Sequence, residues 1–224
     1  MPSKPETVIN QTIELLEQAA QICQEQGEYW VQLRLSLNQC YTDCAQANSA
    51  IGMALGDTLS YDSSDSGRSA SAAIAEAKEH HDNALAAHKN ITSNVNKLQK
   101  IVTKSQGDLK LMASSWPAIA ANPNYLQAIS LLSKPLPALN SQFTYDLTRC
   151  RTLIEKAHKE ARDVAADSNS IVSGAAFALK NCVQEASMLY MSSGSNAANN
   201  IMLARPTTQN FQEAARALAA IQSH

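Results

Sequence analysis

The sequence predicts an all-α fold, an elongated antiparallel bundle of three long helices with short capping helices and a short C-terminal helix. Two observations lead to this prediction. Three long stretches carry apolar residues at helical spacing with no internal proline, and the chain of 224 residues has only 7 glycines and 7 prolines. The prolines lie between these stretches or near the chain ends, so they mark where helices begin and end. We expect a single helical-bundle domain over residues 1–224.

The first stretch, residues 6–55, has mostly apolar residues at positions seven apart, and a second series of the same spacing lies between them. Positions separated alternately by three and four residues fall along one side of a helix, so the pattern predicts one continuous buried stripe. A helix of this length needs neighbours, because long helices gain most of their stability from packing. The first series is Ile9, Leu16, Cys23, Trp30, Leu37, Cys44 and Ile51.

The second stretch, residues 70–115, and the third, residues 139–191, repeat this spacing. Only His81, His88 and Ser105 interrupt the apolar character of the second stripe. The third stripe is rich in small residues, which allow helices to approach closely. We therefore expect three long helices at about 6–55, 70–115 and 139–191.

Glycines are the expected weak points of the long helices. A glycine inside a helix costs about 1 kcal/mol relative to alanine. We expect any bend or interruption to occur at Gly27, Gly107 or Gly174.

The links predict the shorter elements. The link between the first two long helices is polar and serine-rich, which is typical of a short turn between antiparallel neighbours. The second link is longer and contains an apolar run, which predicts a short helix at about 124–133 that caps one end of the bundle over Trp116. After the third long helix, the sequence SSGSN predicts a break, and Pro206 precedes a short amphipathic helix at about 208–222.

Charge and composition disfavour several classes of partner. The net charge is −2 and the isoelectric point is about 6.2, which gives no general attraction to nucleic acid. The low aromatic content of 5% disfavours a large ligand pocket, so we expect neither a cofactor nor a small-molecule substrate. No stretch approaches the ~20 apolar residues that span a bilayer, which disfavours a membrane partner.

The N-terminus has no apolar run of the kind that directs secretion. Five cysteines, most of them on helix stripes, also fit a reducing compartment better than a disulfide framework. We therefore expect a cytoplasmic protein, and export by a non-classical route stays open.

The cysteines and histidines of the first two long helices form a candidate metal site. If these helices pack antiparallel across the short link, Cys40 and Cys44 lie level with Ala84 and His80, and His81 points into the same stripe. Two thiols one helical turn apart, with an imidazole opposite, suit zinc or copper(I). Cys40, Cys44 and His81 are therefore candidate metal ligands, although the same pattern also fits inert core thiols and a hydrogen-bonded core histidine.

The two stripe histidines have a further interpretation. A similar alignment of the second and third long helices places His88 near Ser168 and Asp167. Charging a buried imidazole costs free energy, so His81 and His88 would make the packing sensitive to mild acid.

No nucleophile elbow, phosphate-binding loop, dinucleotide fingerprint or metalloprotease motif occurs in the sequence. We therefore expect no enzyme. The sequence favours a helical-bundle protein that acts through protein–protein interaction or self-association via helix faces. The alternatives are a secreted or injected bacterial helical effector or membrane-active toxin component, and a metal or redox sensor that uses Cys40, Cys44 and His81.

Overall fold

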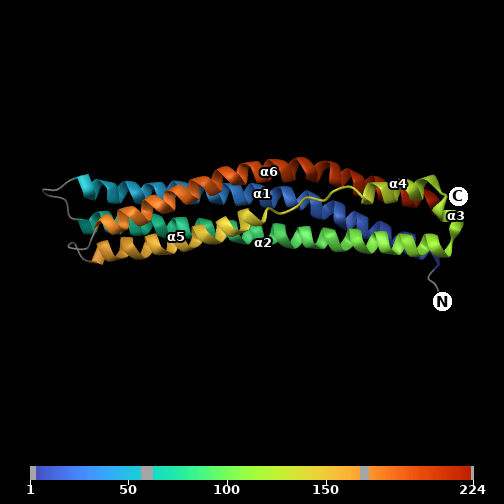
Figure 1. Cartoon of the computed structure of the whole chain (residues 1–224), viewed down its shortest axis with the longest axis horizontal. Helices are drawn as coiled ribbons and strands as arrows, with labels where there is room; N and C mark the ends of the chain where they lie inside the picture. Colours follow the sequence, from blue (N-terminus) through green and yellow to red (C-terminus); the bar gives the residue numbers. More distant parts are fainter. Residues whose placement is uncertain (1–3, 57–62, 167–171, 223–224) are drawn as a thin grey trace. The chain divides into compact units, whose positions relative to one another are not determined.

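A computed structural model describes residues 4–56, 63–166 and 172–222. The described residues form six α-helices and no strand, so the all-α prediction is confirmed. Figure 1 labels the helices α1 Pro5–Gly56, α2 Ser63–Ser115, α3 Pro117–Ala120, α4 Pro123–Leu132, α5 Ser141–Ala166 and α6 Val172–Gln222. No helix in these ranges carries an apolar stretch of the length that a bilayer-spanning helix requires.

The chain divides into two compact units, and α1, α2 and α6 contribute to both. The first unit contains Met1–Trp30, Asn90–Leu139 and Ala198–His224, and the second contains Val31–Lys89 and Asn140–Ala197. Each unit therefore draws on four helical segments longer than one turn: α1, α2, α4 and α6 in the first unit, and α1, α2, α5 and α6 in the second.

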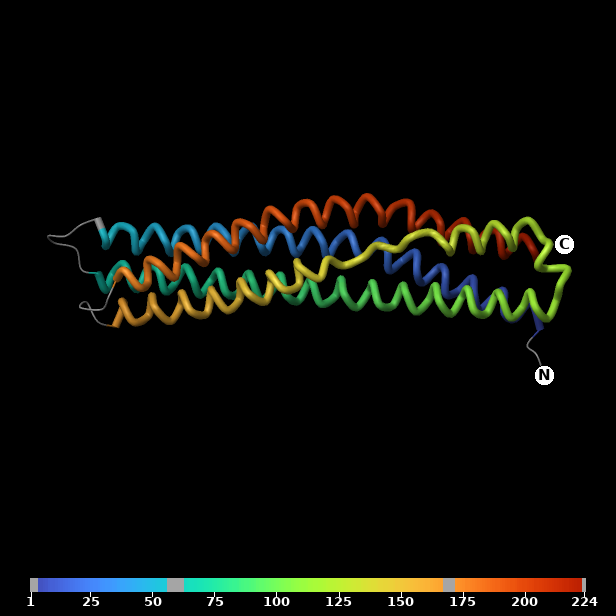
Figure 2. Tube along the Cα trace, in the orientation of Figure 1, coloured from blue at the N-terminus to red at the C-terminus, as the bar shows by residue number. Residues whose placement is uncertain are grey.

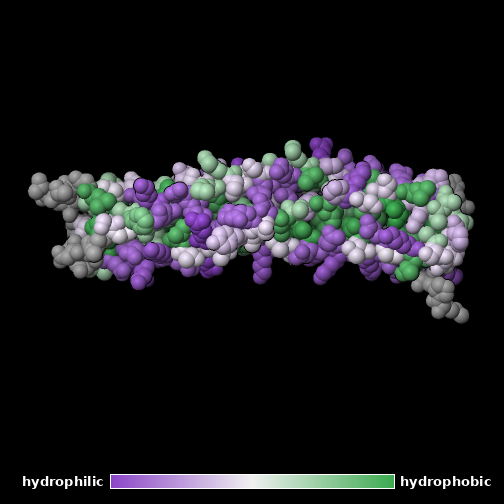
Figure 3. Space-filling view, in the orientation of Figure 1, coloured by the Kyte–Doolittle hydropathy of each residue, from purple (hydrophilic) through white to green (hydrophobic). Residues whose placement is uncertain are grey.

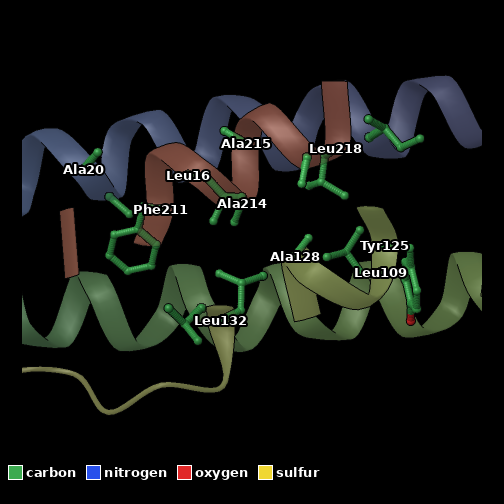
Figure 4. Packing of buried hydrophobic residues seen from close by; sticks show 14 of the residues in the cluster. Leu16, Ala20, Leu109, Tyr125, Ala128, Leu132, Phe211, Ala214, Ala215 and Leu218 are labelled. Carbon is green, nitrogen blue, oxygen red and sulfur yellow. The ribbon is translucent and has the colours of Figure 1, made fainter. Parts of the chain in front are cut away.

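The core of the first unit is built from large apolar residues on all four of its longer segments. Figure 4 shows Leu16 of α1 and Leu109 of α2 with α4 and α6, which contribute Tyr125, Ala128, Leu132, Phe211, Ala214 and Leu218. Trp116 and Leu136 are partly buried against the same core. The link after α2 therefore supplies one of the helices of this unit.

Local sequence explains where α4 begins. Asn122 is its N-cap and accepts a hydrogen bond of 2.9 Å from the backbone N–H of Asn124, and Pro123 occupies the first turn, where a missing N–H costs nothing. The Gln106 side chain then donates to the carbonyl of Leu132 over 2.9 Å, which ties the end of α4 to α2. Figure 2 shows that the chain between α4 and α5 is not helical.

Contacts in the second unit show that α5 and α6 run antiparallel. Arg149 of α5 forms an ion pair with Glu185 of α6, and a Cβ built at Gly174 would lie 3.5 Å from the carboxylate of Glu160. Residue numbers rise along one helix as they fall along the other. The prediction of a single helix over 139–191 is therefore wrong.

The sequence between α5 and α6 accounts for this error. Asp, Ser and Asn side chains in general compete with the backbone hydrogen bonds of a helix. The sequence between α5 and α6, which lies outside the described residues, contains Asp167, Ser168, Asn169 and Ser170. Because Ser168 falls at a stripe position, the spacing of the stripe concealed this preference.

The predicted break after residue 191 and the separate C-terminal helix at 208–222 are also wrong, because α6 continues to Gln222 through Pro206. The polar residues that suggested a break bond within the helix instead. Ser192 and Ser193 donate to the carbonyls of Leu189 and Tyr190, and Asn196 donates to the carbonyl of Ser192. The backbone carbonyls of α6 therefore supply the hydrogen-bond acceptors for these side chains.

The other boundaries agree more closely with the sequence. Helices α1 and α4 match the predicted ranges 6–55 and 124–133 within one residue, and α2 ends at Ser115 as expected. Helix α2 begins at Ser63 rather than near residue 70, and the Asp65 carboxylate in its first turn suits a helix N-terminus and pairs with Arg68. The helices also continue through Gly27 and Gly107, where we expected weak points.

We expect the substitution Gly67→Ala to destabilise the protein and Gly107→Ala to stabilise it, although both glycines lie in α2. A Cβ at Gly67 would lie 2.7 Å from the carbonyl carbon of Val164 in α5, so the backbones must separate, at a cost of about 1–3 kcal/mol. At Gly107 a Cβ would meet nothing within 4 Å, so the gain in helix propensity of about 0.5–1 kcal/mol remains. Chemical denaturation of both variants measures these changes. Equal effects would contradict the close approach of α2 and α5.

Candidate thiol and histidine cluster

Four of the five cysteines lie together in the core of the second unit. Cys40 and Cys44 come from α1, Cys150 from α5 and Cys182 from α6, and all four are fully buried, free thiols. The Sγ atoms of Cys44 and Cys182 are 3.2 Å apart. Cys40 is hydrogen-bonded to both Cys44 and Cys150. The four thiols therefore form one continuous chain of contacts, which we call the thiol cluster.

Helix α2 places His81 beside the thiol cluster, so all four helices of this unit contribute to it. The imidazole is 0% exposed, and neither ring nitrogen makes a hydrogen bond of normal geometry to a described residue. Burial lowers the pKa of His81, while the electrostatic effect of Cys40 and the backbone of Leu147 oppose this shift. His81 is therefore held neutral in an apolar setting.

The thiols differ in how readily they lose a proton. Hydrogen bonds from Cys150 and Cys44 lower the pKa of Cys40, and burial opposes this effect. The contact with Cys182 raises the pKa of Cys44, and the contact with Cys40 raises that of Cys150, with burial adding to both. Among Cys40, Cys44 and Cys150, the thiolate is therefore most favoured at Cys40.

Cys23, in the first unit, provides a contrast. Burial raises its pKa to about 12, and a hydrogen bond with Thr208 offsets part of the effect of burial. It has no part in the thiol cluster, because it belongs to the other unit. A thiol of this kind behaves as a small apolar side chain.

Charged side chains also reach into the second unit. Asp43 is buried, accepts a hydrogen bond from the Gln39 amide over 3.1 Å and lies 3.7 Å from His80. Burial raises the pKa of Asp43. The buried Glu185 carboxylate pairs with Arg149 over 3.2 Å, which offsets the cost of removing the carboxylate from water.

His88 does not lie where the sequence suggested. Its Nε2 is 3.3 Å from the Thr144 hydroxyl, and its ring is tilted against that of Phe143 with centroids 5.9 Å apart. The expected neighbours Ser168 and Asp167 lie outside the described residues. The alignment placed the end of α2 level with the start of the third long helix, whereas α5 begins beside the middle of α2, since Thr144 contacts His88 there.

The structure brings Cys40, Cys44 and His81 into one part of the core, as the sequence suggested. It adds Cys150 and Cys182, which the metal-site prediction did not include. Both occupy stripe positions in the sequence, but their place beside α1 depends on the separation of α5 from α6. Within the ranges that the structure describes, no group of three or more His, Cys, Asp or Glu side chains has an arrangement that would hold a metal ion.

Comparisons with known proteins give no relative. No protein-family model matches the chain, and neither a curated protein nor a solved structure matches it.

We expect the protein to lose stability as the pH falls from about 7.5 to about 5.5. The unfolded chain protonates its histidines below about pH 6.5. The folded protein does not yet protonate His81 and His88, because burial lowers both pKa values. Each histidine therefore removes up to about 1.4 kcal/mol of the free energy of unfolding per pH unit in the interval between the two pKa values.

Urea denaturation at both pH values measures this loss. The variant His81→Leu should lose less stability over the same interval, because one of the histidines whose pKa burial lowers is absent. Asp43 and the thiols are present in both proteins, so the comparison isolates His81. A variant with the same pH dependence as the original chain would show that His81 titrates normally in the folded state.

Proposed function

We propose that the protein is a non-enzymatic binding protein, and that it holds an apolar helix of a partner protein against the exposed face of α6. The observation that carries this proposal is the exposure of large apolar side chains on one face of the α6 segment in the second unit. Phe177, Met188 and Met191 are 65%, 58% and 71% exposed. We call these three residues the α6 face.

Helical geometry supports treating the three residues as one face. Met188 follows Phe177 by about three full turns, and Met191 lies one turn beyond Met188. Buried residues such as Leu179 and Cys182 occupy the other side of the helix. The space-filling view in Figure 3 likewise shows hydrophobic residues among hydrophilic ones at the surface.

The chemistry of the α6 face favours a helical partner. Methionine side chains are flexible and polarisable, so a surface rich in methionine adapts to the apolar face of an incoming helix. Aromatic side chains such as Phe177 are common energetic anchors of interfaces. A second copy of this chain is the alternative occupant, because an apolar face can also pair with itself.

Two further parts of the proposal come from the sequence. We propose that the long helices form one elongated bundle, which would present helix faces over a long distance. We also propose a cytoplasmic location, because five free cysteines fit a reducing compartment better than a disulfide framework.

A toxin or effector role is the first alternative, and a liposome-leakage assay tests it, since a membrane-active helical protein releases an encapsulated dye.

A metal or redox sensor is the second alternative. The grouping of Cys40, Cys44 and His81 supports it, and elemental analysis of protein purified without chelator would show whether zinc or copper is bound.

We expect substitution of the α6 face with polar residues to abolish partner binding. The variant Phe177→Ser, Met188→Gln, Met191→Gln should bind the partner at least about tenfold more weakly, because anchors of an interface each contribute about 1 kcal/mol or more. The matched control is Leu111→Gln in the first unit, where an apolar residue is 70% exposed. The control should bind as the original chain does.

Affinity capture followed by titration with the purified partner measures the loss. Light scattering after size-exclusion chromatography separates the two occupants, since a dimer that the triple substitution dissociates would identify a second copy. The role of the α6 face would be refuted if the protein is a monomer and its captured partner binds the original chain, the triple variant and the Leu111→Gln control equally.

A further inference from the structure

The side chains of the thiol cluster are not part of the α6 face, and their geometry suits disulfide formation. Four thiols in contact within one core place potential disulfide partners side by side. The order of contacts, from Cys182 through Cys44 and Cys40 to Cys150, determines which pairs can bond.

The pair Cys44 and Cys182 is the most direct. Their sulfur atoms are 3.2 Å apart, and a disulfide requires about 2.05 Å, so small movements of two side chains on different helices close the gap. Cys40 and Cys44 are a poor pair although they touch. Residues four apart on a helix have Cβ atoms about 5–6 Å apart, whereas a disulfide needs about 3.5–4.5 Å.

Once Cys44 pairs with Cys182, the remaining contact of Cys40 is with Cys150 on α5. This pair also joins two helices. We propose that the thiol cluster is a site of oxidation by hydrogen peroxide, which converts it into two interhelix disulfides, Cys44–Cys182 and Cys40–Cys150.

The Cys40–Cys150 disulfide forms in two balanced steps. The Cys40 sulfur attacks one oxygen of hydrogen peroxide, the O–O bond breaks, and Cys40 becomes a sulfenic acid while one water leaves. The Cys150 sulfur then attacks the Cys40 sulfur, the S–O bond breaks, and a second water leaves with the Cys150 proton. Two electrons pass from the two thiols to one peroxide.

Cys40 and Cys150 form one reacting pair because their thiols are in contact. The pair Cys44 and Cys182 reacts in the same way with a second peroxide. Because all four thiols are fully buried, a small oxidant of the size of water suits the site, whereas a bulky disulfide oxidant would require the helices to separate.

The consequence is a covalent link from α1 to both α5 and α6. A disulfide that closes a long loop restricts the unfolded chain and stabilises the folded one. The oxidised protein should therefore unfold at a higher temperature than the reduced protein, and a dithiol reductant should reverse the shift.

Peptide mapping after peroxide treatment tests the proposal on the full-length protein. The protein is treated while folded, the remaining thiols are alkylated in denaturant, and the digest is analysed without reduction. We expect two cross-linked peptide pairs, Cys44 with Cys182 and Cys40 with Cys150, and a loss of two hydrogen atoms for each bond. Cys23 should remain alkylatable, because it is a buried thiol outside the cluster.

Three variants make the test specific. Cys182→Ser should retain the Cys40–Cys150 bond, Cys150→Ser should retain the Cys44–Cys182 bond, and Cys23→Ser should form both. Circular dichroism confirms that each variant is folded before treatment. If a variant does not fold, the original chain treated in urea serves as comparison, since without the fold the pairing should be scrambled.

Several results would overturn the proposal. They are full alkylation of all five thiols after treatment of the folded protein, a dominant Cys40–Cys44 bond, or cross-links between separate chains. The proposal would also be overturned if the thiols resist alkylation only until a chelator is added, because a metal would then be holding them.

Discussion

The need to cover apolar helix stripes governs the whole structure. Helices of 52, 53 and 51 residues are not stable in water by themselves, because backbone hydrogen bonds contribute little against water and the apolar stripe must be buried. Each unit meets this requirement with four helical segments. In the second unit α5 accompanies α1, α2 and α6, and in the first unit α4 does so. The link between α2 and α5 is therefore part of a core rather than a simple connection.

The two cores differ in chemical character. The first buries Leu16, Leu109 and Phe211 together with uncharged polar side chains such as Gln26 and Ser105. The second contains four thiols, a neutral imidazole and the buried carboxylates of Asp43 and Glu185. Buried polar groups that lack partners cost free energy. The second unit therefore holds most of the buried ionisable groups, and it also carries exposed apolar residues.

The proposed binding face and the thiol Cys182 lie on opposite sides of α6. In α6, Met188 and Met191 point to solvent while Cys182 and Leu189 are buried. A bond between Cys182 and α1 would restrain the helix that carries the α6 face.

Helical spacing reports local geometry, so it predicted the all-α class, the extents of α1 and α4, the end of α2 and the burial of stripe residues such as Trp30 and Leu98. The same spacing brought Cys40, Cys44 and His81 together across the first link. Contacts between helices were needed to establish that α5 and α6 are antiparallel neighbours, and the structure was needed to show that α6 passes through Pro206. Periodicity indicates which side of a helix is buried, but not which helix covers it. Cys150 and Cys182 join the thiol cluster through contacts between helices far apart in sequence, which no local pattern records.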